Sequence, residues 1–220
     1  MQMSGAQMVC EAIIAEGVKT VFGYPGGAIM HVYDEIYKQN GFEHILTRHE
    51  QAAVHAADGY ARATGEVGVA MVTSGPGFTN AVTGLATAYM DSIPMVVISG
   101  QVPLSLIGTD GFQEIDAVGI SRPCTKHNFL VRTLEELPRI LKEAFYLART
   151  GRPGPILVDI PKDITVDIGE FAYPTDVNIP TYKPTHRGNR RQIEKAAEAI
   201  KKSKKPLLYV GGGAVLSDAY

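Results

Sequence analysis

The sequence predicts an α/β fold: a parallel sheet of about six strands with helices on both faces, followed by the start of a second α/β domain. Short apolar runs rich in β-branched residues alternate with helical patterns along most of the chain. Most of these runs are apolar without a polar alternation, as expected for strands that are buried on both faces of a parallel sheet. Several helical patterns end at a glycine, which tolerates the left-handed backbone that closes a helix.

Strands and helices are predicted from different periodicities. The β-branched apolar runs predict strands at residues 20–24, 44–47, 67–74, 95–100, 128–132 and 155–160. Apolar residues at helical spacing predict helices at residues 4–16, 28–38, 50–64, 78–90 and 134–148. Gly17, Gly41, Gly65 and Gly151 fall where helices are expected to stop. These elements form one predicted domain over residues 1–165.

The pattern changes after residue 165. Spaced prolines at Pro174, Pro180 and Pro184 in polar surroundings predict a linker over residues 166–188. Residues 189–220 are predicted to begin a second domain, with an amphipathic helix at 190–202 and a buried strand at 206–210. One strand and one helix cannot bury their apolar faces alone, so we expect residues 189–220 to be mobile or to depend on further sequence.

Charge and composition exclude several classes of protein. The 21 basic and 23 acidic residues are interspersed and give a net charge of -2, so no basic surface for nucleic acid or anionic lipid is expected. Two cysteines, Cys10 and Cys124, are too few for a disulfide scaffold and fit a reducing compartment. Neither a signal peptide nor an apolar run of about 20 residues is present. We therefore expect a cytoplasmic protein with no membrane partner.

Glu50 is the first candidate for chemistry. It lies where the apolar run at 44–47 gives way to an alanine-rich helical pattern, and in a parallel α/β fold such junctions lie at the carboxyl edge of the sheet, where ligands bind. Its small neighbours leave few polar groups to solvate the carboxylate, so we expect burial to raise the pKa of Glu50 and let it share a proton with a bound heterocycle. The alternative is an exposed acid in the first helical turn, favoured there by the helix dipole.

Three glycine-rich turns share one expected design, in which a strand leads through a tight turn into a helix. They lie at residues 22–27, 73–80 and 211–213. Glycine allows a ligand to approach the main chain closely, but Asn80 stands where a dinucleotide motif would have its third glycine, and a simple turn stays the alternative for each. His49 and His55 do not have the four-residue spacing of a zinc protease motif, so no metal site is expected in this chain.

The order and spacing of several motifs add a resemblance. The motifs include Gly23-Tyr-Pro-Gly-Gly-Ala28, Arg48-His-Glu-Gln51, Val72-Thr-Ser-Gly-Pro-Gly77, Ile107-Gly-Thr-Asp-Gly-Phe-Gln-Glu114 and Gly151-Arg-Pro-Gly-Pro155 with Ile-Leu-Val-Asp-Ile-Pro-Lys-Asp163 after it. With these motifs the chain resembles the thiamine-diphosphate enzymes, and within them the large catalytic subunits of the acetolactate synthase family. The resemblance covers residues 1–165, which match the family's pyrimidine-binding domain, and implies that residues 189–220 begin its central FAD-binding domain.

The resemblance also implies roles for individual residues. Glu50 matches the catalytic glutamate that hydrogen-bonds the pyrimidine ring nitrogen of thiamine diphosphate. The pocket around that cofactor would be lined by Tyr24, Pro25, Gly26, Gly27, Thr73, Pro76, Gly77, Asn80 and Gln113. Phe112, Gln113 and Lys162 would lie near the substrate channel, Ala28 and Pro103 at herbicide-contact positions, and Arg152 against FAD. Packing is the alternative for Phe112, Pro103 and Ala28, and a solvated charge for Lys162 and Arg152.

The family's third cofactor, Mg²⁺, is held by a Gly-Asp-Gly motif that this sequence lacks, so its ligands are expected in a further carboxyl-terminal domain. The complete enzyme would decarboxylate pyruvate and join the product to a second 2-ketoacid, such as 2-ketobutyrate, in branched-chain amino acid biosynthesis. Its expected partners are a second copy in a homodimer or tetramer and, as a candidate, a small regulatory subunit. With half of the cofactor site, this chain alone is expected to be inactive.

Two other functions stay open from the sequence. One is a sister thiamine-diphosphate enzyme, such as a pyruvate oxidase-like decarboxylase or oxidase. The other is a non-enzymatic, doubly wound nucleotide-binding module, which would be indifferent to the loss of the Glu50 carboxylate.

Overall fold

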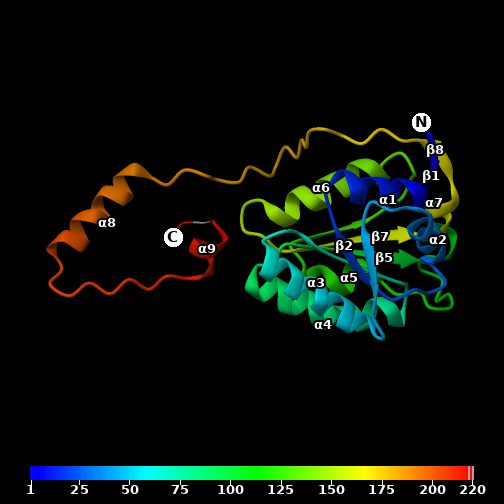
Figure 1. The fold of residues 1–220 in the computed structure, drawn as a ribbon, viewed down its shortest axis with the longest axis horizontal. Coiled ribbons are helices and arrows are strands. Elements are labelled where there is room, and N and C mark those ends of the chain that lie inside the picture. Colours follow the sequence, from blue (N-terminus) through cyan, green and yellow to red (C-terminus); the bar gives the residue numbers. More distant parts are fainter. Residues whose placement is uncertain (218, 220) are drawn as a thin grey trace. The chain divides into compact units, whose positions relative to one another are not determined.

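Six parallel strands form the central sheet, in the order β3-β2-β4-β5-β7-β6. Three of them, β2, β5 and β7, are labelled in Figure 1. The strands are β2 (Thr20–Gly23), β3 (Glu43–Leu46), β4 (Gly68–Val72), β5 (Met95–Gln101), β6 (His127–Leu130) and β7 (Pro155–Pro161). All five neighbouring pairs are parallel. β4, β5 and β7 are buried at every position, which confirms the predicted parallel sheet covered on both faces.

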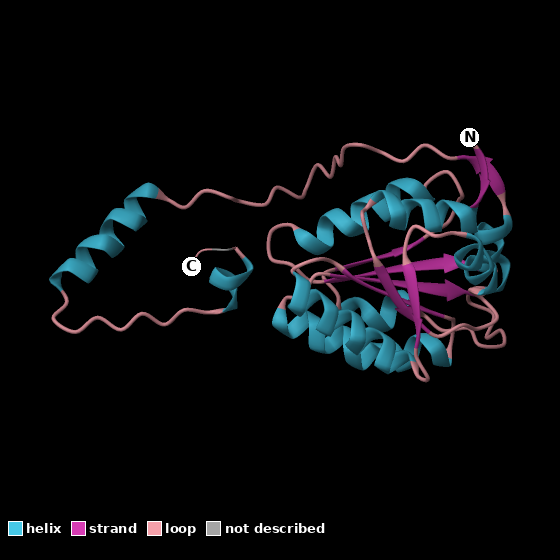
Figure 2. Ribbon diagram, viewed as in Figure 1, coloured by secondary structure: helices cyan, strands magenta, loops and turns pink. Residues whose placement is uncertain are grey.

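The computed structural model describes residues 1–217 and 219, which fall into two units, residues 1–178 and 179–220. In the first unit, helices cover both faces of the sheet (Figure 2). The helix α1 (Gly5–Ala15) contacts α2 (Met30–Lys38) and α6 (Leu137–Arg149) on one face. On the other face α4 (Pro76–Asp91) contacts α3 (Glu50–Thr64) and α5 (Ala117–Ser121). Short helical turns complete the unit: η1 (Leu104–Leu106), η2 (Arg122–Cys124) and α7 (Lys162–Val166).

Helix ends follow the local sequence. Ser4, predicted as the first helical residue, is the N-cap of α1: its side chain accepts from Gln7 N, and the Gln7 side chain accepts from Ser4 N. Gly65 ends α3 with φ +76°, the left-handed conformation that its sequence position predicts. The helix predicted from residue 134 begins only at Leu137, because residues 131–136 form a loop in which the Glu136 carboxylate accepts backbone hydrogen bonds.

A second, two-stranded sheet was not predicted. β1 (Gln2–Ser4) pairs antiparallel with β8 (Ile168–Glu170), within the segment predicted as linker. Beside it lies the Glu16 cluster, in which the buried Glu16 carboxylate accepts hydrogen bonds from Lys142, Arg149 and Tyr173 at 2.7, 2.7 and 2.9 Å. The β1–β8 pairing and the Tyr173–Glu16 hydrogen bond each join residues more than a hundred positions apart. They attach the segment up to residue 173 to the rest of the first unit.

The second unit contains the predicted helix, but not the predicted strand. α8 (Arg190–Lys202) confirms the predicted amphipathic helix, and α9 (Gly212–Leu216) begins at the glycine turn. The prediction of a buried strand at 206–210 is wrong, because these residues have no strand conformation and are all exposed. A strand needs a neighbour to satisfy its backbone hydrogen bonds, and none of the described residues pairs with this segment.

Candidate active site

Three adjacent strands bring together Glu50 and two of the three predicted glycine turns, whereas the third turn, at residues 211–213, belongs to the second unit. β2 lies between β3 and β4, so Gly23 at the end of β2 lies beside Leu46 of β3 and Met71 of β4. The segments that follow these strands therefore begin side by side at the carboxyl edge of the sheet. They carry Glu50 and the glycine turns at residues 24–27 and 73–77.

Glu50 is the first residue of α3, and its neighbours fix it there. His49 precedes it in extended conformation, and His49 Nδ1 accepts a hydrogen bond from Gln51 N at 3.1 Å, which caps the helix. Glu50 is only 8% exposed, so the alternative of an exposed acid is wrong. Its Oε2 accepts a hydrogen bond from Asn80 Nδ2 at 3.0 Å. A buried carboxyl group with a side-chain donor from another helix is thus the centre of the site.

Glu50 and Asn80 meet because α3 and α4 pack closely. A Cβ at Gly84 of α4 would lie 2.6 Å from Val54 Cγ1 of α3, so only glycine allows this approach. Asn80 precedes Gly84 by one turn, and Glu50 precedes Val54 by one turn, so each pair shares a helix face. The helix contact therefore sets the distance between the amide and the carboxylate.

Thr73 joins the two glycine turns. Its Oγ1 accepts a hydrogen bond from Ala28 N at 3.2 Å, which links the turn after β4 to the turn after β2. Its Cγ2 lies 2.4 Å from the position of a Cβ at Gly26 and 2.6 Å from that of a Cβ at Gly77. Both glycines are therefore required by the buried Thr73 side chain. The same Cβ position at Gly77 lies 3.4 Å from Glu50 Oε1, which places the carboxylate beside bare main chain.

The loop after β5 also reaches this edge. Gly75 has φ +57°, and a Cβ there would lie 2.6 Å from the carbonyl oxygen of Gln113. Gln113 itself has φ +59°, a left-handed conformation that costs a non-glycine residue about 1 kcal/mol. The preceding Phe112 is 89% exposed. The loop thus brings the main chain of Gln113, and not the Phe112 ring, against the turn that leads to Gly77.

Tyr33 and His44 border the site, and the sequence did not single them out. A Cβ at Gly23 would lie 2.3 Å from the Tyr33 hydroxyl and 2.9 Å from His44 Nε2, so this glycine makes room for the protein's own side chains. Burial and the negative charge of Glu50 raise the pKa of Tyr33, and burial lowers the pKa of His44. Both shifts favour the neutral forms of these side chains. The feature of the sequence that could have pointed to these two side chains is Gly23, the last residue of β2.

The remaining predicted residues are divided between the two edges of the sheet. Tyr24 and Pro25 lie in the turn after β2, where Tyr24 N donates to Met71 O at 3.2 Å, and Pro76 is the first residue of α4. Lys162 begins α7 after β7, at the same edge but across β5. Arg152 precedes β7 at the opposite edge, where its Nε donates to Ser92 Oγ at 2.7 Å. The structure therefore does not bring Arg152 together with Glu50.

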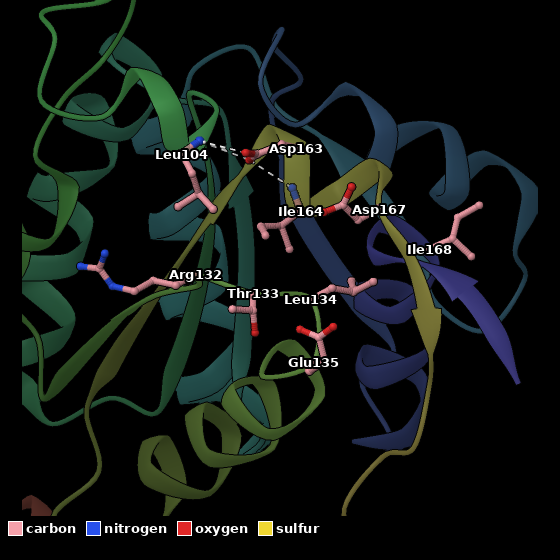
Figure 3. Close-up of a pocket in the computed structure, with 9 residues that line it drawn as sticks. All are labelled: Leu104, Arg132, Thr133, Leu134, Glu135, Asp163, Ile164, Asp167 and Ile168. Atoms are coloured by element: carbon pink, nitrogen blue, oxygen red, sulfur yellow. Dashed lines mark hydrogen bonds between the residues drawn. The ribbon is translucent and has the colours of Figure 1, made fainter.

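A pocket of about 340 Å³ lies beside α7 (Figure 3). It is lined by Leu104, Arg132, Thr133, Leu134, Glu135, Asp163, Ile164, Asp167 and Ile168. Within it the Asp163 carboxylate accepts hydrogen bonds from Leu104 N at 3.1 Å and from Ile164 N at 3.2 Å. β6 and β7 stand at the far end of the sheet from β2 and β3, so this pocket is distinct from the group around Glu50.

Residues 1–217 and 219 contain no cluster of three or more histidine, cysteine, aspartate or glutamate side chains that could hold a metal ion. They also contain no helix that is both long and apolar enough to cross a membrane. Cys10 and Cys124 are buried free thiols, and burial raises the pKa of each, to about 12 for Cys10.

Comparison with known proteins points to one family. The family described as "Thiamine pyrophosphate enzyme, N-terminal TPP binding domain" matches residues 3–120. That range contains Glu50, Thr73, Asn80 and Gln113, whereas Arg152 and Lys162 lie outside it. The matched range therefore includes Glu50, the two glycine turns after β2 and β4, and the loop after β5, which meet at the carboxyl edge.

Curated relatives resemble the whole chain. It is 57% identical over 220 residues to the acetolactate synthase isozyme 3 large subunit of Escherichia coli (strain K12), which covers 99% of this chain and 38% of that protein. It is 57% identical to the acetolactate synthase large subunit of Haemophilus influenzae and 53% identical to the acetolactate synthase large subunit IlvB1 of Mycobacterium tuberculosis, again over 99% of this chain and over 38% and 35% of those proteins. The chain thus spans less than two fifths of the length of these relatives.

Proposed function

The chain belongs to the thiamine pyrophosphate enzymes, and from this membership we propose that it is the amino-terminal, pyrimidine-binding part of an acetolactate synthase large subunit. The identities of 53 to 57% to large subunits of that name, over nearly the whole chain, support this choice within the family. They do not favour the pyruvate oxidase-like alternative. Family membership likewise speaks against a non-enzymatic nucleotide-binding module.

The observation that carries the proposal is the buried Glu50 carboxyl group. Asn80 donates to one of its oxygens, and the other lies against the bare main chain at Gly77. A flat aminopyrimidine needs both features, since a carboxyl group must reach a ring nitrogen and no side chain must block the ring. The residues present therefore fit the pyrimidine half of thiamine diphosphate.

When bound, thiamine diphosphate supplies the carbanion-stabilising chemistry that a 2-ketoacid needs in order to lose carbon dioxide. Glu50 contributes a proton at its carboxyl oxygen, shared with the pyrimidine ring nitrogen in a place from which water is excluded. Asn80 keeps the carboxyl plane in one orientation. The glycines at 26 and 77 make room for Thr73, which links their turns, and Gly75 makes room for the main chain of Gln113.

The remaining parts of the proposal come from the family resemblance. Pyruvate is the first substrate, and pyruvate or 2-ketobutyrate is the second. Mg²⁺ and the diphosphate are held by residues outside this chain, and FAD is bound mainly by the domain that residues 189–220 begin, with Arg152 as a contact. The enzyme works in the cytoplasm as a homodimer or tetramer, with a small regulatory subunit as a candidate partner.

The test is Glu50→Gln in the complete enzyme. This change keeps the side chain's shape and its acceptor for Asn80 but removes the acidic proton, so we expect kcat for acetolactate formation to fall by about 10² to 10⁴-fold. Exchange of the thiamine C2 proton, followed by NMR, is expected to slow in parallel. The exposed Glu66, which follows α3, provides the matched control Glu66→Gln, with activity like that of the parent. Near-normal turnover and proton exchange in Glu50→Gln would reject this role for Glu50.

A further inference from the structure

The loop of residues 104–116 is tied down at both ends: its start to Asp163 of α7, and its end to Gln101 of β5. At its start, Leu104 N donates to the Asp163 carboxylate. At its end, the carbonyl oxygen of Ile115 accepts a hydrogen bond from Gln101 Nε2 at 2.9 Å. Between these points the loop is closed on itself, because the Glu114 carboxylate accepts hydrogen bonds from the backbone N–H groups of Gly108, Thr109 and Gly111.

The Gln101 side chain is buried and makes three hydrogen bonds. Gln101 is the last residue of β5 and is 3% exposed. Its Nε2 donates to Ile115 O and also to Asp159 Oδ2 at 3.0 Å, while its Oε1 accepts from Val102 N at 2.8 Å. Asp159 lies on β7 in register with Ser99 of β5 and is 1% exposed. A buried carboxyl group therefore orients the amide that holds the end of the loop.

The loop that this amide holds includes Gln113. Gln113 keeps a left-handed backbone conformation while its main chain presses on Gly75. Such a conformation persists only where surrounding contacts impose it. The contact of Gln101 with Ile115 lies two residues further along the chain. It joins this end of the loop to the buried sheet, where the Ile115 side chain also packs against the core.

We infer that Gln101 and Asp159 are positioning residues for the cofactor pocket: they hold the loop of residues 104–116 so that the main chain of Gln113 closes on the Gly75 turn. The inference rests on the proposed function for the identity of the cofactor. The hydrogen-bonded chain from Asp159 through Gln101 to Ile115 stands independently of it. Neither residue is a catalytic residue, since both act through the loop.

The chain offers variants that separate positioning from general destabilisation. Gln101→Leu removes both donors, and Asp159→Leu removes the acceptor that orients Gln101. Asp159→Asn keeps an acceptor oxygen for Gln101 Nε2 and is the conservative rescue. Val158→Ala opens a cavity on the opposite face of the same strand, and is the control for loss of stability without loss of the chain of hydrogen bonds.

Two measurements on the complete protein test the inference. In Gln101→Leu and Asp159→Leu, backbone amide hydrogen exchange in residues 104–116 is expected to accelerate by about 10-fold or more, and the thiamine diphosphate concentration for half-maximal activity to rise by about 10-fold or more. At saturating cofactor, kcat is expected to stay within about 3-fold of the parent, because Glu50 and Asn80 lie on other elements. Asp159→Asn and Val158→Ala are expected to behave like the parent in both measurements.

Unchanged exchange of the loop in Gln101→Leu would overturn the inference. Equal acceleration in Val158→Ala would also overturn it, since the effect would then follow from stability alone. If the parent protein binds no thiamine diphosphate, the proposed function fails, and the exchange measurement still decides whether the pair holds the loop.

Discussion

The buried Asp159 carboxyl group is expected to make the stability of the chain depend on pH. Burial raises the pKa of Asp159 from an ordinary value of 3.8 to about 7, opposed in part by the neighbouring side chains of Gln101 and Ser99 and assisted by the nearby charge of Asp116. The other carboxyl oxygen, Oδ1, is buried without a hydrogen-bond partner within the described residues. The protonated form therefore suits the folded chain better than the charged form. Asp159→Asn replaces it with a neutral side chain of the same shape.

The size of the effect follows from the two pKa values. Because the folded value is the higher one, the stabilisation from the bound proton is fully present below about pH 4 and is lost as the pH rises to about 7. At about 1.4 kcal/mol for each pKa unit, the whole loss is about 4 kcal/mol, of which about 3 kcal/mol falls between pH 5 and pH 8. Asp159→Asn cannot lose this proton. The free energy of unfolding of Asp159→Asn, relative to that of the parent, is therefore expected to grow by about 3 kcal/mol from pH 5 to pH 8.

Urea unfolding of both proteins at pH 5, 6, 7 and 8 measures this difference. All other titratable groups are shared, so their contributions cancel when the two curves are subtracted. Asp34→Asn makes the same chemical change at an exposed position of α2 and is the matched control. A difference between Asp159→Asn and the parent that stays constant from pH 5 to pH 8 would refute the assignment of a raised pKa to Asp159.

Two further predictions concern a packing contact and a buried ion-pair cluster. Gly77→Ala would place a Cβ 2.6 Å from the Thr73 methyl group, so we expect the free energy of unfolding to fall by about 1–3 kcal/mol. Adding Thr73→Ser removes that methyl group and is expected to restore most of the loss. A double variant that is no more stable than Gly77→Ala would contradict the contact. Glu16→Ala removes the acceptor of the Glu16 cluster and is expected to cost about 2 kcal/mol, below the usual cost for a fully buried pair because the cations are partly exposed. Urea unfolding of Glu16→Ala is compared with that of Glu11→Ala, which makes the same change at an exposed position. Equal losses in the free energy of unfolding would show that the Glu16 cluster contributes nothing.

Several features of the site were visible in the sequence because they depend on neighbours along the chain. Glu50 follows a short apolar run and precedes an alanine-rich helical pattern, which is enough to place it at a strand-to-helix junction. The glycines at 26, 75 and 77 stand in turns for the same reason. The prediction of a strand at 206–210 was wrong although the residues there favour a strand. A strand also needs a neighbouring strand to pair with, and the local sequence does not show whether one is present.

The order and type of the main strands and helices in the first unit were thus determined by the sequence alone, because apolar periodicity reflects how each segment is buried. The tertiary structure decided which of them touch. The strand order brought Glu50 and the two glycine turns after β2 and β4 to one edge, Gly84 set the distance between Glu50 and Asn80, and burial between β5 and β6 gave Asp159 its raised pKa. The pairing of β1 with β8 likewise depends on residues far apart in the chain. Hydrogen bonds and electrostatic fields act across space, so no local pattern in the sequence could specify them.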